Sequence, residues 1–159
     1  MSAIISACGQ YRYTLTRDPH DLHTTAGPAL FIMLNPSTAD ASLDDPTIRR
    51  CRGFAKYWDC AGIVVANLYA LRATDPSALW VHPDPIGEEN DYWLAQLIRE
   101  HETVVCAWGA HARPDRVAAL RSMFHWLSRP MCLGITKSGA PRHPLYIKAD
   151  QPLIDWSPA

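Results

Sequence analysis

Short apolar runs mark the strands that the sequence predicts. Four of them are nearly continuous and end at polar or turn residues, over residues 29–34, 62–68, 103–107 and 131–135. Runs of this length, bounded by turn residues, are typical of strands buried on both faces of a sheet. Residues 11–16 instead alternate between large apolar and polar side chains, which predicts an earlier strand.

Apolar residues at helical spacing lie between these runs. Residues 45–58 predict a helix, with Asp45 as its N-cap and Pro46 as its first residue. Further helices are expected after Gly87 and over residues 114–126. Strands that alternate with helices favour a parallel sheet with helices on both faces. We therefore expect one α/β domain over residues 1–159, a three-layer α/β/α fold with a four-stranded, mainly parallel central sheet.

Each of the four apolar runs leads into a polar loop. The loops read NPSTAD, NLYALRATDP, WGAHAR and TKSGAPRHP. In open parallel sheets, ligands bind at the carboxyl ends of the strands. A functional site is therefore expected where these loops meet.

The charges of the chain nearly balance, with 15 basic and 16 acidic side chains among 159 residues. This balance argues against a protein that coats nucleic acid non-specifically, although it allows a local basic face. No stretch of 18 apolar residues is present, and the start of the chain lacks the basic and apolar regions of a signal peptide. We expect a cytoplasmic monomer without membrane contact.

The five cysteines are odd in number and include no C-x-x-C pair. This spacing argues against a disulfide framework, a zinc site or an iron–sulfur cluster. We expect reduced, structural cysteines and a protein that needs neither a metal nor another cofactor.

Polar residues at three strand ends are the first candidates for chemistry: Asn35, Asn67 and His143. An asparagine amide both donates and accepts hydrogen bonds, and a neutral imidazole donates one. Each of the three also fits an ordinary structural role, in a turn or in contact with a neighbouring loop. Their meaning depends on the order in which they occur along the chain.

In order, five segments resemble the uracil-DNA glycosylase superfamily. IMLNPS resembles its G-x-N-P-G or G-Q-D-P-Y loop, and DDPTIRRCRGFAKYWDCAG resembles the H-P-x-N-R-F-W helix that follows. GIVVANLYALRA resembles the strand ending in N-T-V-L-T-V-R or H-N-L-C-P-L, and VVCAWGAHA the strand leading to L-W-G-x-x-A. GAPRHPLY resembles the closing H-P-S-P-L-S motif. Together the segments span about residues 31–146.

The segments LNPSTAD, DPTIRRC, NLYALRATDP and PRHPLY also look like an uncharacterised bacterial and phage domain family. That family has no established activity. The near resemblance therefore indicates kinship, and only the distant one implies chemistry.

The superfamily resemblance implies a DNA glycosylase, which breaks the N-glycosidic bond of a flipped, modified or damaged base without a metal. Asn35 would position the attacking water, although its amide cannot serve as a general base. His143 would donate a hydrogen bond to the base oxygen as negative charge develops there. Asn67 would read the base edge. The other residues expected to bind the base are Pro36, Ser37 and Tyr69.

Contacts to the nucleic acid would come from basic side chains and one loop. The basic candidates are Arg49, Arg50, Arg72 and Arg142, of which the first two fit a solvated helix face equally well. Leu145, Tyr146 or Ile147 would wedge the duplex. The segment HPLY lacks the phosphate-binding serine of the superfamily motif, and Ser37 stands where its branches have glycine or tyrosine.

Two other function classes fit the same sequence. The open sheet could hold a free nucleotide or nucleoside, as in a hydrolase or transferase of small substrates, and the near-neutral charge favours this over tight duplex binding. Alternatively, the three candidate residues could recognise a modified base without catalysis. The partner is in each case DNA or a nucleotide.

Overall fold

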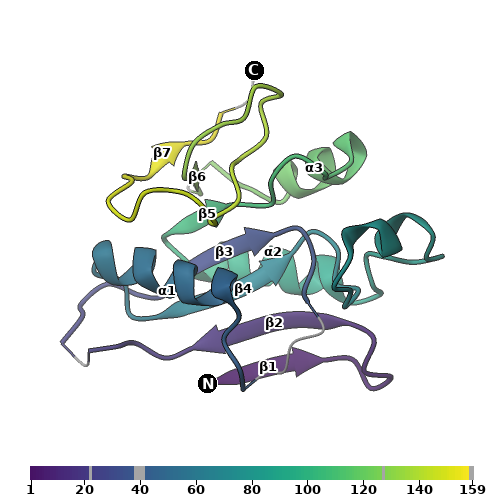
Figure 1. The fold of residues 1–159 in the computed structure, drawn as a ribbon, viewed down its shortest axis with the longest axis horizontal. Coiled ribbons are helices and arrows are strands. Elements are labelled where there is room, and N and C mark those ends of the chain that lie inside the picture. Colours follow the sequence, from purple (N-terminus) through teal and green to yellow (C-terminus); the bar gives the residue numbers. More distant parts are fainter. Residues whose placement is uncertain (22, 38–41, 127, 158–159) are drawn as a thin grey trace.

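The structure, a computed structural model, describes residues 1–21, 23–37, 42–126 and 128–157. Figure 1 shows its elements along the chain. In order, they are β1 (Ser2–Ile5), β2 (Arg12–Arg17), β3 (Ala29–Met33), α1 (Pro46–Tyr57), β4 (Ile63–Asn67), the 3₁₀ helix η1 (Pro76–Trp80), α2 (Asn90–Glu100), β5 (Val104–Cys106), α3 (Pro114–Arg121), β6 (Pro130–Cys132) and β7 (Ile154–Asp155).

The described strands form one seven-stranded mixed sheet in the order β1-β2-β4-β3-β5-β6-β7. β4, β3, β5 and β6 are parallel to one another, and they are the strands that the four apolar runs predicted. β1 and β2 extend one side of this parallel group and β7 extends the other, all by antiparallel pairing. The carboxyl ends of the four parallel strands therefore lie at one edge of the sheet.

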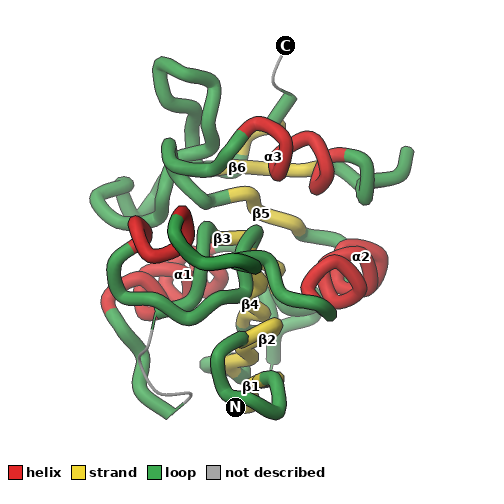
Figure 2. The backbone as a smooth tube through the Cα atoms, turned by 90° about the vertical axis from the view of Figure 1, so that its right-hand side faces the viewer, coloured by secondary structure: helices red, strands yellow, loops and turns green. Residues whose placement is uncertain are grey.

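Helices cover both faces of the sheet (Figure 2). Along β3, Leu30 and Ile32 join the core cluster that contains residues of η1, α2 and α3. Phe31 and Met33 face the other way, into the cluster that contains Phe54 of α1. Because successive side chains of a strand point to opposite faces, a five-residue apolar strand can fill both clusters.

Local sequence fixes where α1 begins and where β4 follows it. The carboxylate of Asp45 accepts the backbone N–H of Ile48 at 2.8 Å, and Pro46 occupies the first helical position. After the helix, Gly62 has a positive φ of 86°, and a Cβ there would collide with the carbonyl oxygen of Arg17. A glycine is therefore required at the turn into β4.

Two expectations about the elements were wrong. The sheet has seven strands rather than four, because β2, which was expected as an earlier strand, joins it together with two short edge strands that were not expected, β1 and β7. The third helix ends at Arg121 rather than at residue 126. There the hydroxyl of Ser122 donates to the carbonyl of Ala119 at 2.6 Å, a local bond of the kind that competes with helix continuation.

Candidate functional site

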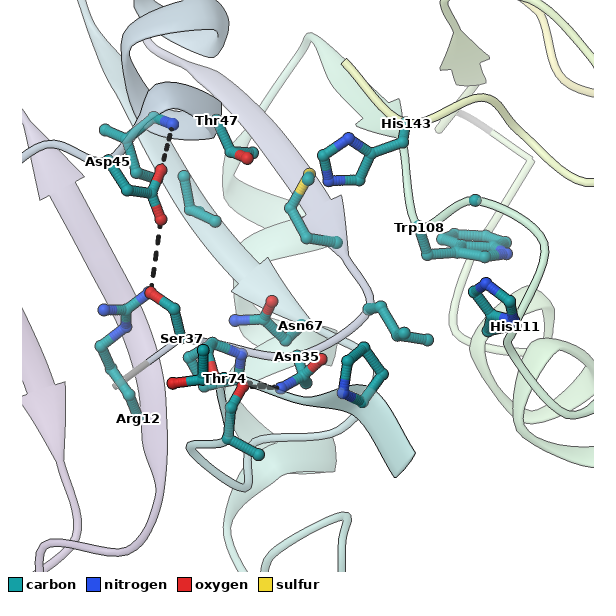
Figure 3. A pocket seen from close by; sticks show the side chains of 18 of the residues that line it. Arg12, Asn35, Ser37, Asp45, Thr47, Asn67, Thr74, Trp108, His111 and His143 are labelled. Atoms are coloured by element: carbon teal, nitrogen blue, oxygen red, sulfur yellow. Dashed lines mark hydrogen bonds between the residues drawn. The ribbon is translucent and has the colours of Figure 1, made fainter. Parts of the chain in front are cut away.

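A cavity of about 390 Å³ lies at the carboxyl ends of the parallel strands (Figure 3). The segment after β3 contributes residues 35–37, β4 contributes Asn67, and the segment after β5 contributes residues 108–111. His143 enters from the loop after β6, and Asp45, Thr47 and Ile48 enter from the start of α1. The volume is within the range of small-molecule sites, about 300–1,000 Å³.

Asn67 presents a buried amide to this cavity. The residue is only 2% exposed, and its side chain has no hydrogen-bonding partner among the residues that the structure describes. The amide atoms of Asn67 are not among the fully enclosed polar atoms that lack a partner, so they are open to the cavity. In a cavity wall, such an amide is available to pair with a ligand.

Two buried polar residues on the opposite face of the sheet hold the backbone beside Asn67. The side-chain amide of Asn90 donates to the carbonyls of Asn67 and Leu68, each at 3.0 Å. The guanidinium of Arg116 also donates to the Leu68 carbonyl, at 2.7 Å, and pairs with Asp91 at 2.6 Å. These contacts fix the end of β4, so Asn90 and Arg116 are positioning residues that the sequence pattern did not reveal.

His143 projects its ring into the cavity (Figure 3). Its Nδ1 accepts the backbone N–H of Leu145 at 3.2 Å. In the neutral ring this bond places the proton on Nε2, which can then donate to a ligand. Burial lowers the pKa of His143, and the carboxylate of Asp45 partly offsets that effect. The ring is therefore a neutral donor at pH 7.

This environment predicts a pH dependence of stability. Below about pH 6.5, the ordinary pKa of histidine, the unfolded chain binds a proton that half-buried His143 resists. The free energy of unfolding should therefore decrease as the pH falls from 7.5 to 5.5. Thermal melts should show a smaller decrease in His143→Gln than in the wild type, and equal decreases would contradict this assignment.

The loop of His143 is tied to the neighbouring strand end. The backbone N–H of Gly109 donates to the carbonyl of Pro141 at 2.9 Å, and Gly109 has a positive φ of 77°. A Cβ at Gly109 would lie 3.7 Å from the Cβ of His143. Beside Gly109, the ring of Trp108 lines the cavity and packs edge-on against Trp156, with centroids 4.9 Å apart.

Asn35 lines the cavity, and its amide also has a structural role. The NH₂ group donates to the carbonyls of Pro36 and Ala73, at 3.1 and 2.9 Å. These bonds join the segment after β3 to the segment that follows β4. The Oδ1 atom of Asn35 has no partner in the described part of the chain, and it can accept a hydrogen bond from water.

Asp45 brings a carboxylate into the same cavity. Its Oδ1 caps α1, and its Oδ2 accepts the hydroxyl of Ser37 at 3.3 Å. Of the described residues that line the cavity, Asp45 is the one with an acidic side chain. The sequence pattern indicated Asp45 as a helix cap, but it gave no sign that the cap also faces the site.

Arg12 is the second charged residue of the cavity, and the sequence pattern missed it altogether. Alternation along residues 11–16 is typical of a half-exposed strand, but Arg12 is only 5% exposed. Burial, together with repulsion from Arg72, lowers the pKa of its guanidinium from 12.5 to about 10. Arg12 therefore remains positively charged at neutral pH.

The cavity lining does not include Tyr69, which was expected to bind the base, or Leu145, which was expected to contact the nucleic acid. Tyr69 is buried in the core on the other face, where it packs edge-on against Trp80 and accepts the backbone N–H of Arg113. Its direction differs from that of Asn67 because the chain leaves the sheet between them. Leu145 contributes its backbone N–H to His143 rather than a side chain to the cavity. Pro36 and Ser37 do line the cavity.

The four arginines proposed to contact nucleic acid are outside the cavity lining. Arg49 is exposed and donates to the carbonyl of Asp44, and the guanidinium of Arg50 lies 4.9 Å from the centroid of the Phe54 ring. Arg72 donates to the carbonyl of Gly9 at 3.1 Å. Arg142 is exposed beside Gly134. The first two contacts agree with a helix face that packs locally and meets solvent.

The described residues contain no group of three or more His, Cys, Asp or Glu side chains that could hold a metal ion. Cys51, Cys60, Cys106 and Cys132 are buried, and Cys8 is exposed; none of the five forms a disulfide. Burial raises the pKa of the Cys106 thiol, which keeps it protonated and unreactive. In the part of the chain that the structure describes, no helix is long and apolar enough to cross a bilayer.

One family model matches most of the chain. The family described as "Protein of unknown function (DUF1643)" matches residues 12–145. The chain belongs to the DUF1643 family. The near resemblance to an uncharacterised domain family is thereby confirmed, and nothing in the comparisons links DUF1643 to the uracil-DNA glycosylase superfamily. No curated protein and no solved structure matches the chain.

The boundaries of the DUF1643 match coincide with the site. The match begins at Arg12, the first residue of the cavity wall, and ends shortly after His143, the last one. β1 and β7 fall outside it. The family region therefore contains every described residue that lines the cavity.

Proposed function

We propose that this DUF1643 protein hydrolyses the N-glycosidic bond between a nucleobase and its sugar, in DNA or in a nucleotide. The observation that carries the proposal is the amide of Asn67, which is 2% exposed, lines the cavity and lacks a protein partner among the described residues. An amide offers one donor and one acceptor side by side, which matches the edge of a base.

The five segments that resemble the uracil-DNA glycosylase superfamily supply further support. Each contributes a residue to the wall of the cavity, in chain order Asn35, Asp45, Asn67, Trp108 and His143. Residues from five separate segments surround one space at the sheet edge where ligands of parallel sheets bind.

In the proposed reaction, different residues act on the two ends of the bond that breaks. The electron pair of the C1′–N bond leaves with the base, and the Nε2–H of His143 donates to the base oxygen on which negative charge develops. Water adds to C1′, and its proton passes to the carboxylate of Asp45. The Oδ1 of Asn35 accepts a hydrogen bond from that water and orients it.

Asp45 completes a function that the sequence alone left open. The amide of Asn35 can orient water but cannot take its proton. The carboxylate of Asp45 accepts one bond from Ile48 and one from Ser37, and its remaining lone pairs can accept the water proton. In this proposal Asn35 positions the water, and Asp45 accepts its proton.

His143→Ala tests catalysis against mere binding. The rate of base release should fall about 10²–10³-fold, the usual loss for one donor to a developing oxyanion, whereas substrate affinity should change little. His82 gives a matched control, because its Nδ1 likewise accepts a backbone N–H two residues on, from Asp84 at 3.1 Å, outside the cavity. His82→Ala should leave the rate unchanged.

The measurements are the rate of free-base release and the affinity of the same substrate by calorimetry. Loss of affinity in His143→Ala without any base release by the wild type would contradict the hydrolase proposal. That outcome would instead indicate a module that recognises a base without catalysis.

A further inference from the structure

Among the buried arginines of the described chain, Arg12 differs in that its guanidinium forms no ion pair. Arg17 pairs with Asp44 at 2.6 Å, and Arg116 pairs with Asp91 at the same distance. The guanidinium of Arg12, which is 5% exposed and lines the cavity, makes no ion pair or hydrogen bond within the described residues. Burying a charge without a partner lowers the stability of the fold. A stable fold therefore retains such a charge only where another gain in free energy offsets the loss.

An irregularity in β2 directs Arg12 to the cavity. Ile4 of β1 pairs with Thr14, but the next residue, Ile5, pairs with Arg12, so β2 has one extra residue at Tyr13. Leu15 belongs to the core cluster of the α1 face, and Arg12 reaches the same side three residues away. Regular alternation would place them on opposite faces, and a bulge removes that difference.

The charged groups around Arg12 act on its guanidinium in both directions. Arg72 and Arg17 both repel its guanidinium, and Asp45 attracts it. Asp44 neutralises Arg17. Among the described lining residues, Asp45 is the acidic one that attracts Arg12, and its carboxylate is already shared with two hydrogen-bond donors.

The start of α1 adds a donor on the same wall. Pro46 has no N–H. The carboxylate of Asp45 accepts the N–H of Ile48, and the backbone carbonyl of Asp45 accepts the N–H of Arg49. Thr47 lines the cavity, and its N–H has no partner in the described ranges. Helix N-termini favour anions, and a guanidinium binds phosphate oxygens through two parallel bonds.

We infer that the cavity takes a nucleotide rather than a nucleoside, with a phosphate paired to Arg12 and the N-terminus of α1 while Asn67 binds the edge of the base. The inference rests on the proposed function for the base-binding half of the site. The phosphate belongs either to a free nucleoside monophosphate or to a nucleotide within a strand. The chemistry that Arg12 recognises is the same in both.

Calorimetry on the full chain tests the inference. The probes are the 5′-monophosphates of deoxyadenosine, deoxyguanosine, deoxycytidine, thymidine and deoxyuridine, the five matching nucleosides, and single-stranded pentanucleotides with each base in the middle. The wild type should bind at least one monophosphate about 10- to 100-fold more tightly than its nucleoside, the scale of a hydrogen-bonded charge. Tighter binding of the pentanucleotide than of the monophosphate would identify a strand as the source of the phosphate.

Variants of Arg12 assign the preference to that side chain. In Arg12→Gln the ratio of the nucleoside dissociation constant to the nucleotide dissociation constant should fall to about one. The ratio for Arg12→Lys should lie between that of Arg12→Gln and that of the wild type. Arg99→Gln, which replaces an exposed arginine of α2, should keep the wild-type ratio. The melting temperature of Arg12→Gln should equal or exceed that of the wild type, because an uncompensated buried charge is removed.

The outcomes separate this inference from the proposed function. Equal affinity for nucleoside and nucleotide, no measurable affinity for either, or a preference that survives in Arg12→Gln would overturn the phosphate site. Base release that is equally fast from nucleosides and nucleotides would leave the hydrolase standing and also overturn it. An Arg12-dependent preference without base release would support the phosphate site and refute the hydrolase.

Discussion

Asn67→Leu should lower the rate of base release from the preferred substrate by roughly 10⁴-fold, the scale on which sites that hydrogen-bond a substrate discriminate against a missing partner. Leucine keeps the number and the branching of the side-chain heavy atoms of asparagine, while it removes both the donor and the acceptor of the amide. Discrimination between bases should fall together with the rate. The measurement is kcat/KM for each base of a substrate panel.

Stability distinguishes a binding role of Asn67 from a structural one. Its side chain has no partner among the described residues, so the melting temperature of Asn67→Leu should equal or exceed that of the wild type. Asn90→Leu is the matched control, because the Asn90 amide donates to two backbone carbonyls at 3.0 Å. It should lose about 1–3 kcal/mol of unfolding free energy. Equal destabilisation of the two variants would show that Asn67 is part of the core.

Asp45→Asn should reduce base release by about 10²–10⁴-fold, the usual contribution of a general base. Asparagine caps helices about as well as aspartate, so the melting temperature should stay near that of the wild type. Asp45→Ala should lose the same activity and, in addition, about 1 kcal/mol of stability, because α1 loses its cap. The comparison separates the two functions of one side chain.

Asp75 provides the control for this substitution. It caps η1 through the backbone N–H of Ser77 at 2.9 Å, and it lies outside the cavity lining. Asp75→Asn should change neither activity nor stability. Wild-type base release by Asp45→Asn would exclude the proton-accepting role.

The parallel part of the fold could be predicted because its signals are local. Each parallel strand is a short apolar run buried on both faces, and Asp45 followed by Pro46 defines the start of α1. The meeting of Asn35, Asn67 and His143 then follows from a general property of parallel sheets, whose strand ends share an edge. β1 and β7 have no such signal, because edge strands a few residues long need little apolar surface.

The charged half of the site could not be predicted, because its position depends on irregular backbone. A bulge at Tyr13 changes the side of the sheet that Arg12 faces. The residue types of β2 fit a strand with or without that bulge, so the sequence does not show which side Arg12 faces. Asp45 caps α1 equally well with or without a cavity beside it, so the capping pattern does not reveal its place in the site. Tyr69 shows the opposite error: two residues after Asn67 it no longer follows the alternation of β4, because the strand has ended.

The central claim is that the cavity supports cleavage of an N-glycosidic bond, and free base released by the wild type measures it most directly. Single-stranded and duplex oligonucleotides, each with one altered base, and the corresponding nucleotides are incubated with the protein at pH 7.5, and the free base is separated by chromatography. The account predicts release of one base, or of a few related bases, with matching abasic sites in the oligonucleotides, and loss of both signals in Asn67→Leu. Release of no base from any substrate by a folded wild-type protein would contradict it.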